Sequence, residues 1–318
     1  MNNFEFIPFD ATDIAQLTSK REGELKLGEE LSHQATENTQ FIILGICEDI
    51  GPQANLGNPG AANTFIPSIT KFVNMQSNRL CNGKDTALIG YIQQKCSFTS
   101  VENGRLLVAE LDELVSTVLQ PYFEQGITPI VVGGGHNNAY PIIQAYSKCK
   151  KQPLEVVNLD PHADCRPLEG RHSGNPFSYA KRDGFLGQYT VLGLHGAYNS
   201  ENMLKYLNEQ EFYYSYFAEY MVRPDKLNSD LQTIIIRSDE DLGIELDLDS
   251  IKDMPSSAFT PTGFELETAR KYVMKLASSK RKAAYLHLPE GAPINESEVK
   301  FVSKSIAYLI HDFIASSR

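Results

Sequence analysis

LEVVNLDPHAD, residues 154–164, joins a mostly apolar run to three side chains of types that bind metals. Its first six residues have the length and composition of a strand buried in a parallel sheet. Because side chains alternate between faces along extended backbone, Asp160, His162 and Asp164 are expected to point the same way. Pro161 has no backbone N–H to donate, which indicates that the chain has left the sheet for a loop. Two carboxylates and an imidazole at the carboxyl end of a strand predict half of a metal site.

Other apolar runs with the character of strands alternate with helical patterns along the chain. These further strands are expected at residues 41–46, 127–132, 190–194, 243–248 and 284–288. Repeated strand, helix and strand predicts an α/β layer fold with a mainly parallel sheet. Such sheets bind ligands at the carboxyl ends of their strands. Because the chain has no internal repeat and no low-complexity linker, we expect a single domain over residues 1–318.

A helix is expected over residues 106–123, where apolar side chains recur at a helical period. The period stops at Gly126, and Pro121 is expected to bend the last turn. By contrast, residues 51–78 are rich in Asn, Gly and Pro, so we expect a long loop over one face of the molecule there.

The start of the last helix is marked by a capping pattern. Asn295 is a plausible N-cap with Glu298 at N3, and Ile294 and Val299 sit where a hydrophobic staple would place them. The buried face of this helix is expected to consist of Val299, Val302, Ile306, Ile310, Phe313 and Ile314.

The overall composition argues against several classes of protein. A chain of 318 residues with 42% hydrophobic and 22% charged residues is ordinary for a soluble globular protein. The net charge of −11, without a Lys/Arg cluster, argues against nucleic acid and against an anionic membrane as partner. No apolar run is long enough to span a bilayer, and residues 1–13 lack the pattern of a signal peptide. Five scattered cysteines without a C-x-x-C motif favour free thiols in a reducing cytoplasm.

Two further polar motifs follow expected strands. GGGHNN, residues 133–138, allows a tight turn and a close approach of backbone to a ligand. Alone it is a weak signal, because the spacings of phosphate and dinucleotide loops are absent, and His136 by itself would more often be a helix-start histidine. Asp247 and Asp249 again share a face of extended chain, although such a pair alone is more often a solvated strand end or a helix cap.

The three motifs together are a much stronger signal than any one of them. They bring four carboxylates and two imidazoles to the ends of strands in one sheet. Without cations, such carboxylates would repel one another and some would take up protons, whereas two divalent cations would balance four Asp charges. An oxygen-rich set without a thiolate suits Mn²⁺ better than a structural Zn²⁺. Two ions about 3.5–4 Å apart can share a water and lower its pKa toward ~7.

In this order the motifs resemble those of the ureohydrolase family, which comprises arginases, agmatinases and formimidoylglutamases. The resemblance covers roughly residues 41–317 and implies the three-layer arginase-like fold, with a mainly parallel central sheet flanked by helices. The matching motifs are Gly-Gly-His at 134–136, Asp-Pro-His-Ala-Asp at 160–164, Ser-Gly-Asn-Pro at 173–176, Asp-Leu-Asp at 247–249 and Glu-Gly-Ala-Pro at 290–293.

The resemblance implies two Mn²⁺ ions per chain, with Asp160 and Asp247 bridging them. The ligands of one ion would be His136, Asp160, Asp164 and Asp247. The ligands of the other would be His162, Asp160, Asp247 and Asp249. By the same resemblance, Glu290 would bind the amidine or guanidinium group of a small-molecule substrate, and Asp164 could pass a proton to the leaving amine.

Departures from the arginase pattern indicate which members of the family the chain resembles most. Gly135 stands where arginases have Asp, and Ser173 stands where they have a proton-shuttling His; formimidoylglutamases are similar to this chain at both positions. Arg166 follows the metal motif by two residues, as in formimidoylglutamases, and could clamp a carboxylate bidentately; a plain surface arginine is the alternative. The candidates for substrate binding are Arg166, Ser173, Asn175 and Glu290.

The predicted reaction is hydrolysis of N-formimidoyl-L-glutamate to L-glutamate and formamide, a step of histidine degradation, by a cytoplasmic enzyme that could form a homo-oligomer. One alternative is an arginase or another guanidino-substrate ureohydrolase. A second is an arginase-fold binding protein that has lost catalysis, which the unusual Pro161, Asn137 and Asp253 motivate and which the presence of all six ligand residues opposes. A binuclear metallophosphatase is disfavoured because it would normally begin with D-x-H rather than with the Gly-His loop.

Other polar residues near the motifs have more ordinary interpretations. His287 lies within a strand pattern and is expected to be a core histidine with a partner. His195 is expected to be a strand-end histidine, and Asn199 is a weaker candidate for substrate contact.

Overall fold

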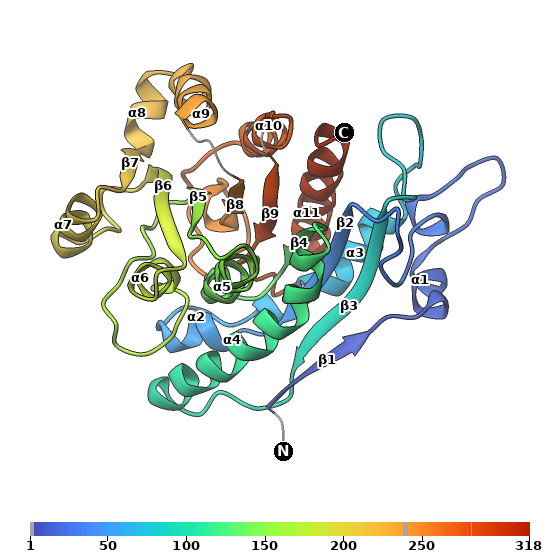
Figure 1. The fold of residues 1–318 in the computed structure, drawn as a ribbon, viewed down its shortest axis with the longest axis horizontal. Helices are drawn as coiled ribbons and strands as arrows, with labels where there is room; N and C mark the ends of the chain where they lie inside the picture. The colour runs from blue at the N-terminus through green and yellow to red at the C-terminus, as the bar shows by residue number, and fades with distance from the viewer. Residues whose placement is uncertain (1–2, 238–240, 281) are drawn as a thin grey trace.

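The computed structural model describes residues 3–237, 241–280 and 282–318. Within these residues the strands form one nine-stranded sheet with the order β1-β3-β2-β4-β9-β8-β5-β6-β7 (Figure 1). β1 runs antiparallel to β3, and the other neighbouring strands are parallel. The strands are β1 (Phe4–Pro8), β2 (Phe41–Cys47), β3 (Thr86–Gln94), β4 (Thr128–Val132), β5 (Leu154–Leu159), β6 (Leu186–Leu194), β7 (Tyr213–Tyr216), β8 (Leu242–Leu246) and β9 (Ala283–Leu288).

Helices cover both faces of the sheet and complete a three-layer structure. The α-helices are α1 (Ala11–Leu17), α2 (Ile50–Ala54), α3 (Phe65–Val73), α4 (Val101–Glu124), α5 (Ala139–Lys150), α6 (Pro176–Arg182), α7 (Glu201–Glu209), α8 (Phe217–Val222), α9 (Lys226–Arg237), α10 (Leu266–Ala277) and α11 (Glu296–Ser316). Helices α2, α4, α5 and α6 pack together on one face, and α3, α11 and α10 pack together on the other. The predicted α/β architecture with a mainly parallel sheet is confirmed. Among the described helices, none is long and apolar enough to cross a membrane.

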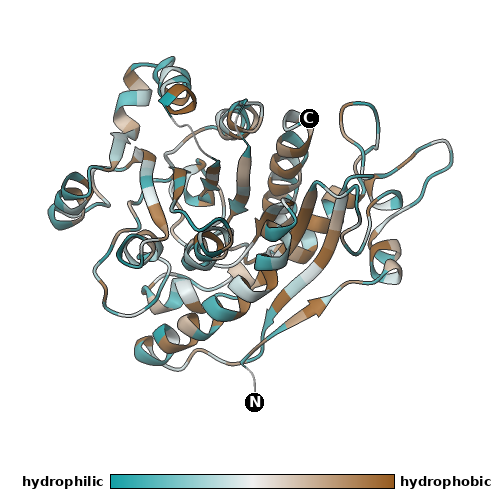
Figure 2. Ribbon diagram, viewed as in Figure 1, coloured by the Kyte–Doolittle hydropathy of each residue, from teal (hydrophilic) through white to brown (hydrophobic). Residues whose placement is uncertain are grey.

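Two hydrophobic cores lie between the sheet and the helical layers. Along β4, Ile130 and Val132 belong to the core under α3 and α11, while Val131 belongs to the core under α4 and α5. Because both faces of a parallel sheet are buried, its central strands are almost continuous apolar runs. Figure 2 shows this hydrophobic colouring along β2.

The strand predictions are most accurate in the middle of the sheet. β5 has the predicted limits, and β2, β4 and β9 differ from the predicted ranges by one residue. β6 begins earlier than expected, at Leu186, and β8 ends at Leu246 because Asp247 caps a short 3-10 turn. The sequence prediction misses β1, β3 and β7. β1 and β7 are sheet edges, and β3 contains the glycine Gly90, so their apolar patterns are weak.

The expectation of a long loop over residues 51–78 is wrong. This segment contains most of α2, a 3-10 turn at Ala61–Asn63 and the nine-residue helix α3. The buried residues of α3 have a helical spacing, since Phe65, Ile69, Phe72 and Val73 all face the core. The Asn, Gly and Pro residues that dominate the composition lie mainly before this helix, so composition alone concealed it.

The last helix begins as predicted, but without the expected staple. Asn295 is the N-cap of α11 and accepts a hydrogen bond from the Glu298 N–H at 3.0 Å. Ile294 is 81% exposed, so it does not pack as a staple; instead its N–H donates to the Glu298 carboxylate at 2.8 Å. Val299 is partly exposed, and the rest of the predicted face is buried: Val302, Ile306, Ile310, Phe313 and Ile314.

Helix α4 starts earlier than its apolar period suggests. Ser100 is its N-cap and accepts the Asn103 N–H at 3.2 Å, so the helix begins at Val101, five residues before the predicted start. The helix continues through Pro121 to Glu124, and Gly126 follows it with a φ of +73°. The glycine was therefore a reliable stop signal.

Candidate metal centre and active site

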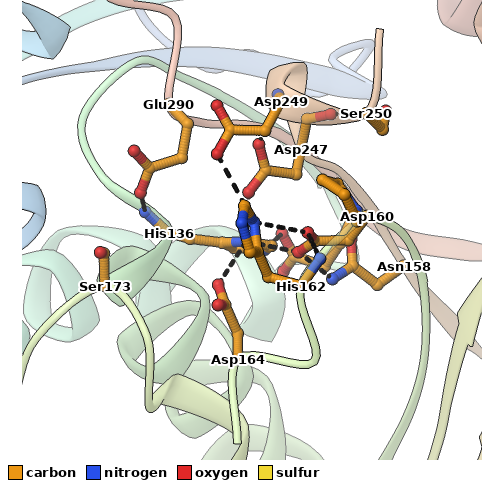
Figure 3. A network of polar contacts seen from close by, with 12 residues as sticks. His136, Asn158, Asp160, His162, Asp164, Ser173, Asp247, Asp249, Ser250 and Glu290 are labelled. Carbon is orange, nitrogen blue, oxygen red and sulfur yellow. Dashed lines mark hydrogen bonds and ion pairs between the residues drawn. The ribbon is translucent and has the colours of Figure 1, made fainter. Parts of the chain in front are cut away.

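Four adjacent strands, β4, β9, β8 and β5, end at one edge of the sheet and place polar side chains there. Asp160 follows β5 directly and Asp247 follows β8 directly, while His136 and Glu290 come a few residues after β4 and β9. Figure 3 shows these side chains turned toward one another. The structure brings the other three candidates into the same group: His162, Asp164 and Asp249.

His136 is the centre of the first half of this group. Its Nδ1 atom lies 2.9 Å from Asp247 Oδ2, 3.0 Å from Asp164 Oδ2 and 3.2 Å from Asp160 Oδ2. One ring nitrogen carries at most one proton, so it cannot donate hydrogen bonds to three carboxylates at once. The four ligand atoms lie within 4.8 Å of one another, and one cation among them could satisfy all four.

The second half is formed around His162. Its Nδ1 atom lies 3.5 Å from Asp160 Oδ1 and 3.7 Å from Asp249 Oδ2. The ring is partly exposed and stacks on Tyr198 with 5.3 Å between the centroids. Asp160 faces His136 with one carboxylate oxygen and His162 with the other, so it could bridge two cations.

The protonation behaviour of the group indicates negative charge without enough compensation. Burial, and after it the charge of Asp249, raises the pKa of Glu290 to about 8. Burial also raises the pKa of Asp247, and Asp249 and Asp160 add to that effect. Although burial lowers it, contact with Asp160 raises the pKa of His162 to about 10. Without metal ions, bound protons offset the negative charge of these carboxylates, and divalent cations could offset it instead. The carboxylate and imidazole donors therefore fit two divalent ions of the Mn²⁺ type.

The side chains converge because the loops turn, and extended-chain alternation does not by itself account for it. Asp164 has a φ of +47° and Glu290 a φ of +69°, both in the left-handed region. Such a conformation costs a non-glycine residue about 1–3 kcal/mol. It is held at Glu290 by a hydrogen bond from its N–H to the Gly134 carbonyl at 2.9 Å. Asp247 and Asp249 are joined by a 3-10 turn, in which Asp247 Oδ1 accepts the Asp249 N–H at 2.7 Å.

The glycine loop before His136 requires glycine at three positions. Gly133 and Gly134 have φ values of +87° and +72°, which favour glycine. A Cβ atom at Gly135 would lie 2.4 Å from Pro52 Cδ and from Asn137 Oδ1. The Asp that arginases have at this point of the motif therefore does not fit here.

Glu48 is a buried residue of the site that the sequence analysis missed. Its Oε1 accepts hydrogen bonds from the Gly135 N–H at 2.8 Å and from the amides of Asn138 at 2.9 Å and Asn137 at 3.3 Å. Its Oε2 accepts the Gly51 N–H at 3.0 Å. The unusual pair of asparagines after His136 thus helps to fix the glycine loop. A charged residue directly after the apolar run of β2 was the available signal.

A cavity of about 160 Å³ opens over the metal-binding candidates. Its lining also includes three of the predicted substrate residues: Arg166, Ser173 and Glu290. The Arg166 side chain is exposed at this cavity, and within the described residues its guanidinium has no hydrogen bond or ion pair. Ser173 Oγ lies 3.4 Å from Asn55 Nδ2, which is a lining residue as well.

Asn175 lies outside the cavity lining and ties its own loop together. Its Oδ1 accepts hydrogen bonds from Arg171 Nη1 at 2.8 Å and from the His172 N–H at 3.1 Å. Its Nδ2 donates to the Gly170 carbonyl at 2.7 Å, and the residue is fully buried. These contacts give Asn175 a role in holding the loop that carries Ser173.

The residues given ordinary interpretations behave largely as expected. His287 is a buried core histidine whose Nδ1 lies 2.6 Å from Glu245, so the prediction of a partner is confirmed. His195 stacks on Tyr198 at 4.2 Å. Asn199 accepts the Ala163 N–H at 2.8 Å and donates to the Pro161 carbonyl at 2.9 Å, which fixes the loop between the metal-binding candidates.

His172 makes the stability of this region depend on pH. Its Nδ1 accepts the Gly174 N–H at 3.1 Å, and burial, followed by the charge of Arg105, lowers the pKa of His172 to about 4. The folded pKa lies below the unfolded value of 6.5, so the unfolded chain takes up a proton first as the pH falls. Stability is therefore present above pH 6.5 and is lost toward pH 4.

The variant His172→Asn is expected to lose less stability between pH 7.5 and pH 5 than the wild type, by about 1–2 kcal/mol. The Asn side chain keeps an acceptor for the Gly174 N–H but does not titrate in this range. Urea unfolding of both proteins at both pH values, with a chelator present, measures the difference. An identical loss in the two proteins would contradict this assignment.

Residues 40–315 match the sequence model of the arginase family, and the chain therefore belongs to the arginase family. Among curated proteins, the formimidoylglutamase of Photorhabdus laumondii is 25% identical over 261 residues, which are 79% of this chain and 76% of the relative. The formimidoylglutamase of Rhodococcus jostii is 26% identical over 170 residues, 51% of this chain. The match spans 49%, about half, of that relative's length.

Solved structures show the same fold at lower identity. A Trypanosoma cruzi formiminoglutamase with Mn²⁺ has a TM-score of 0.75 and 20% identity, covering 92% of this chain and 98% of that one. The agmatine ureohydrolase of Thermoplasma volcanium has a TM-score of 0.73 and 17% identity, covering 96% and 97%. Together with the nine-stranded sheet, these similarities confirm the arginase-like fold.

Proposed function

We propose that this protein is a binuclear manganese hydrolase that cleaves a C–N bond of an amidine-type substrate, namely N-formimidoyl-L-glutamate. Water would be added and the products would be L-glutamate and formamide. The observation that carries the proposal is that Arg166 and Glu290 line the same cavity as the metal-binding candidates. The names of the Photorhabdus and Rhodococcus relatives support the substrate, and the Trypanosoma structure with Mn²⁺ supports the metal.

Two Mn²⁺ ions would be held by the six convergent side chains, with Asp160 and Asp247 shared between them. The ligand residues would be six side chains that lie together in Figure 3: His136, Asp160, His162, Asp164, Asp247 and Asp249. When bound, such a pair of ions would lower the pKa of a water toward ~7, so that hydroxide is available as the nucleophile at neutral pH.

Glu290 is held rigidly enough to orient the reacting group. Its Oε1 accepts the His136 N–H at 2.7 Å, and its Oε2 accepts the hydroxyl of Ser257. The remaining lone pairs would accept N–H groups of the formimidoyl moiety and place its carbon above the metal centre. Asp164 borders the same cavity with a side chain that is 12% exposed, so it could carry a proton to the leaving amine.

Arg166 would bind a carboxylate of the glutamate moiety at the rim of the cavity. Because no described residue pairs with this guanidinium, it is free to form a bidentate pair with such a group. A carboxylate-free amine such as agmatine would leave this arginine unused. The cavity of about 160 Å³ is also below the ~300–1,000 Å³ of sites for drug-sized ligands, which favours a small substrate.

The experiment that tests the proposal is a comparison of substrates on protein loaded with Mn²⁺. Formamide release from N-formimidoyl-L-glutamate and urea release from arginine and agmatine are measured under the same conditions. We expect formamide release to dominate. Urea release from arginine without formamide release would instead make the protein a guanidino-substrate ureohydrolase, and the absence of all three activities would leave only a binding protein.

The variant Arg166→Met is expected to raise KM for N-formimidoyl-L-glutamate by about 10–100-fold with a smaller change in kcat. A charge-assisted pair contributes about 1.5–3 kcal/mol to binding, and each 1.4 kcal/mol is a factor of ten. Steady-state kinetics measure the split, and Arg79→Met, an exposed arginine outside the cavity lining, is the matched control. An unchanged KM in the Arg166 variant would remove this residue from the substrate site.

Two broader expectations complete the proposal. A single domain over residues 1–318 is supported by the strands from β1 to β9, which join one sheet. A cytoplasmic location is supported by the five cysteines, all of which are free thiols in the structure.

A further inference from the structure

Glu245 is a fully buried carboxylate on β8, two residues before Asp247. Its Oε1 accepts a hydrogen bond from the Tyr285 hydroxyl at 2.6 Å, and its Oε2 lies 2.6 Å from His287 Nδ1. Both partners belong to the neighbouring strand β9. The carboxylate is therefore fixed between two strands, on the side of the metal-binding group that faces the core.

The Glu245 carboxylate also lies next to Nε2 of His136, the ring nitrogen that does not face the aspartates. Its Oε2 lies 3.3 Å from His136 Nε2, while the Nδ1 atom of the ring faces the aspartates. The His136 ring is held edge-on against Phe177 at 5.3 Å and against His287 at 5.9 Å. Phe177 and His287 limit how far the ring can turn, so the contact with Glu245 is set by the packing of the core.

Metal binding through Nδ1 determines which ring nitrogen of His136 carries the proton. A neutral imidazole that binds a cation through Nδ1 carries its proton on Nε2. His136 Nε2 is buried, and within the described residues it has no aligned hydrogen-bond partner, although Glu245 is only 3.3 Å away. An unpaired buried N–H is unfavourable, and a small rotation of the ring toward Glu245 would pair it.

We propose that Glu245, held by Tyr285 and His287, is a positioning residue that fixes the tautomer and orientation of His136 for metal binding. The inference rests on the proposed metal centre. A carboxylate behind a ligating histidine raises metal affinity, and its loss typically costs 10–100-fold. Because His136 belongs to only one of the two proposed ion sites, the effect should fall on that ion.

The test is a Mn²⁺ titration of metal-free protein by calorimetry, with manganese electron paramagnetic resonance as a second readout. For Glu245→Gln we expect two ions per chain, one with a Kd about 10–100-fold higher than in the wild type and one nearly unchanged. Asp312→Asn is the matched control. Asp312 on α11 is also a buried carboxylate, and it pairs with Arg270 on α10 at 2.6 Å, outside the group of metal-binding candidates. We expect this control to lose stability but to keep both Kd values.

The possible outcomes separate this inference from the proposed function. A wild-type protein that does not bind two ions would overturn the metal centre itself. Two ions in the wild type with unchanged Kd values in Glu245→Gln would overturn only the positioning role. The ligand atoms of His136, Glu245 and His287 lie within 4.8 Å of one another and could themselves hold an ion. A third ion in the wild type would therefore also overturn the positioning role, because Glu245 would then be a metal ligand.

A second variant covers the case in which Glu245→Gln does not fold. Tyr285→Phe removes one hydrogen bond to Glu245 and leaves the carboxylate in place. We expect the same ion to bind about 3–10-fold more weakly, since a single hydrogen bond contributes about 0.5–1.5 kcal/mol. Unchanged binding in this variant would overturn the positioning role.

Discussion

The variant Asp247→Asn is expected to lower Mn²⁺-dependent kcat/KM by about 10³-fold or more, while the metal-free protein becomes no less stable. Asp247 Oδ2 lies 2.9 Å from His136 Nδ1, and the residue is one of the two proposed bridges between the ions. An asparagine keeps the oxygen that accepts the Asp249 N–H, but it presents an amide NH₂ that cannot bind a cation. Losing several kcal/mol of metal-based activation corresponds to about three powers of ten in rate.

The stability of the same variant is expected to change in the opposite direction. Burial and neighbouring carboxylates raise the pKa of Asp247, so its charged form is unfavourable when no cation is bound. Removing this charge should leave the Tm in a chelator equal to or above that of the wild type. The rise in Tm on adding Mn²⁺ should be much smaller than in the wild type.

Scanning calorimetry with and without Mn²⁺, together with the formamide assay, measures both effects. Asp225→Asn is the matched control, because Asp225 is an exposed residue outside the cavity lining. A variant at Asp247 that retains activity, or that keeps the full Mn²⁺-induced rise in Tm, would contradict the assignment of this residue as a shared ligand.

The variant Asp112→Ala is expected to destabilise the protein by about 3–5 kcal/mol. Asp112 on α4 and Arg171 form a buried ion pair, with distances of 2.8 Å from Nε to Oδ2 and 3.3 Å from Nη2 to Oδ1. The guanidinium also lies over the rings of Tyr140 and Tyr179, at 4.5 Å and 5.0 Å from their centroids. Removing Asp112 leaves a positive charge that is buried without its counter-charge.

The ion pair also connects α4 to the candidate active site. Arg171 Nη2 donates to the Asn137 carbonyl at 2.9 Å, directly after His136, and Nη1 donates to Asn175. We therefore expect Asp112→Ala to weaken Mn²⁺ binding as well as stability. Burial raises the pKa of Asp112 to about 6 despite Arg171. At pH 7.5, which lies above this value, the carboxylate is charged and the ion pair is present.

Urea unfolding at pH 7.5 gives the loss of stability. The double variant Asp112→Ala/Arg171→Met removes both charges and should lose less than the sum of the two single variants. Glu296→Ala, which breaks the exposed ion pair with Lys300, is the control and should change stability very little. Simple additivity in the double variant would contradict a strong interaction between Asp112 and Arg171.

The sequence predicts that the metal-binding candidates converge because their positions depend on a simple geometric rule. Asp160 and Asp247 each follow an apolar strand directly, and the carboxyl ends of parallel strands meet at one edge. The order of these strands is a different matter. β9 lies between β4 and β8 although it is last in the chain, and no local pattern encodes that arrangement.

The parts of the site that escape prediction depend on contacts between distant residues. Glu48 reaches the Gly135 N–H across 87 positions, and Glu245 reaches His287 across 42. In the sequence each is an acidic residue in or beside an apolar strand, and these two partners lie far away along the chain. Likewise, alternation predicts only that side chains share a face, and it does not predict the positive φ of Asp164 and Glu290. At Glu290 this conformation comes with a hydrogen bond from its N–H to the distant Gly134 carbonyl.

The most direct measurement of the central claim is the anomalous diffraction of manganese in crystals of protein loaded with Mn²⁺. We predict two peaks about 3.5–4 Å apart. One should lie between His136 and Asp164, the other between His162 and Asp249, with Asp160 and Asp247 between the peaks. A map without manganese peaks at this group of side chains, or with a single peak bound elsewhere, would contradict the account.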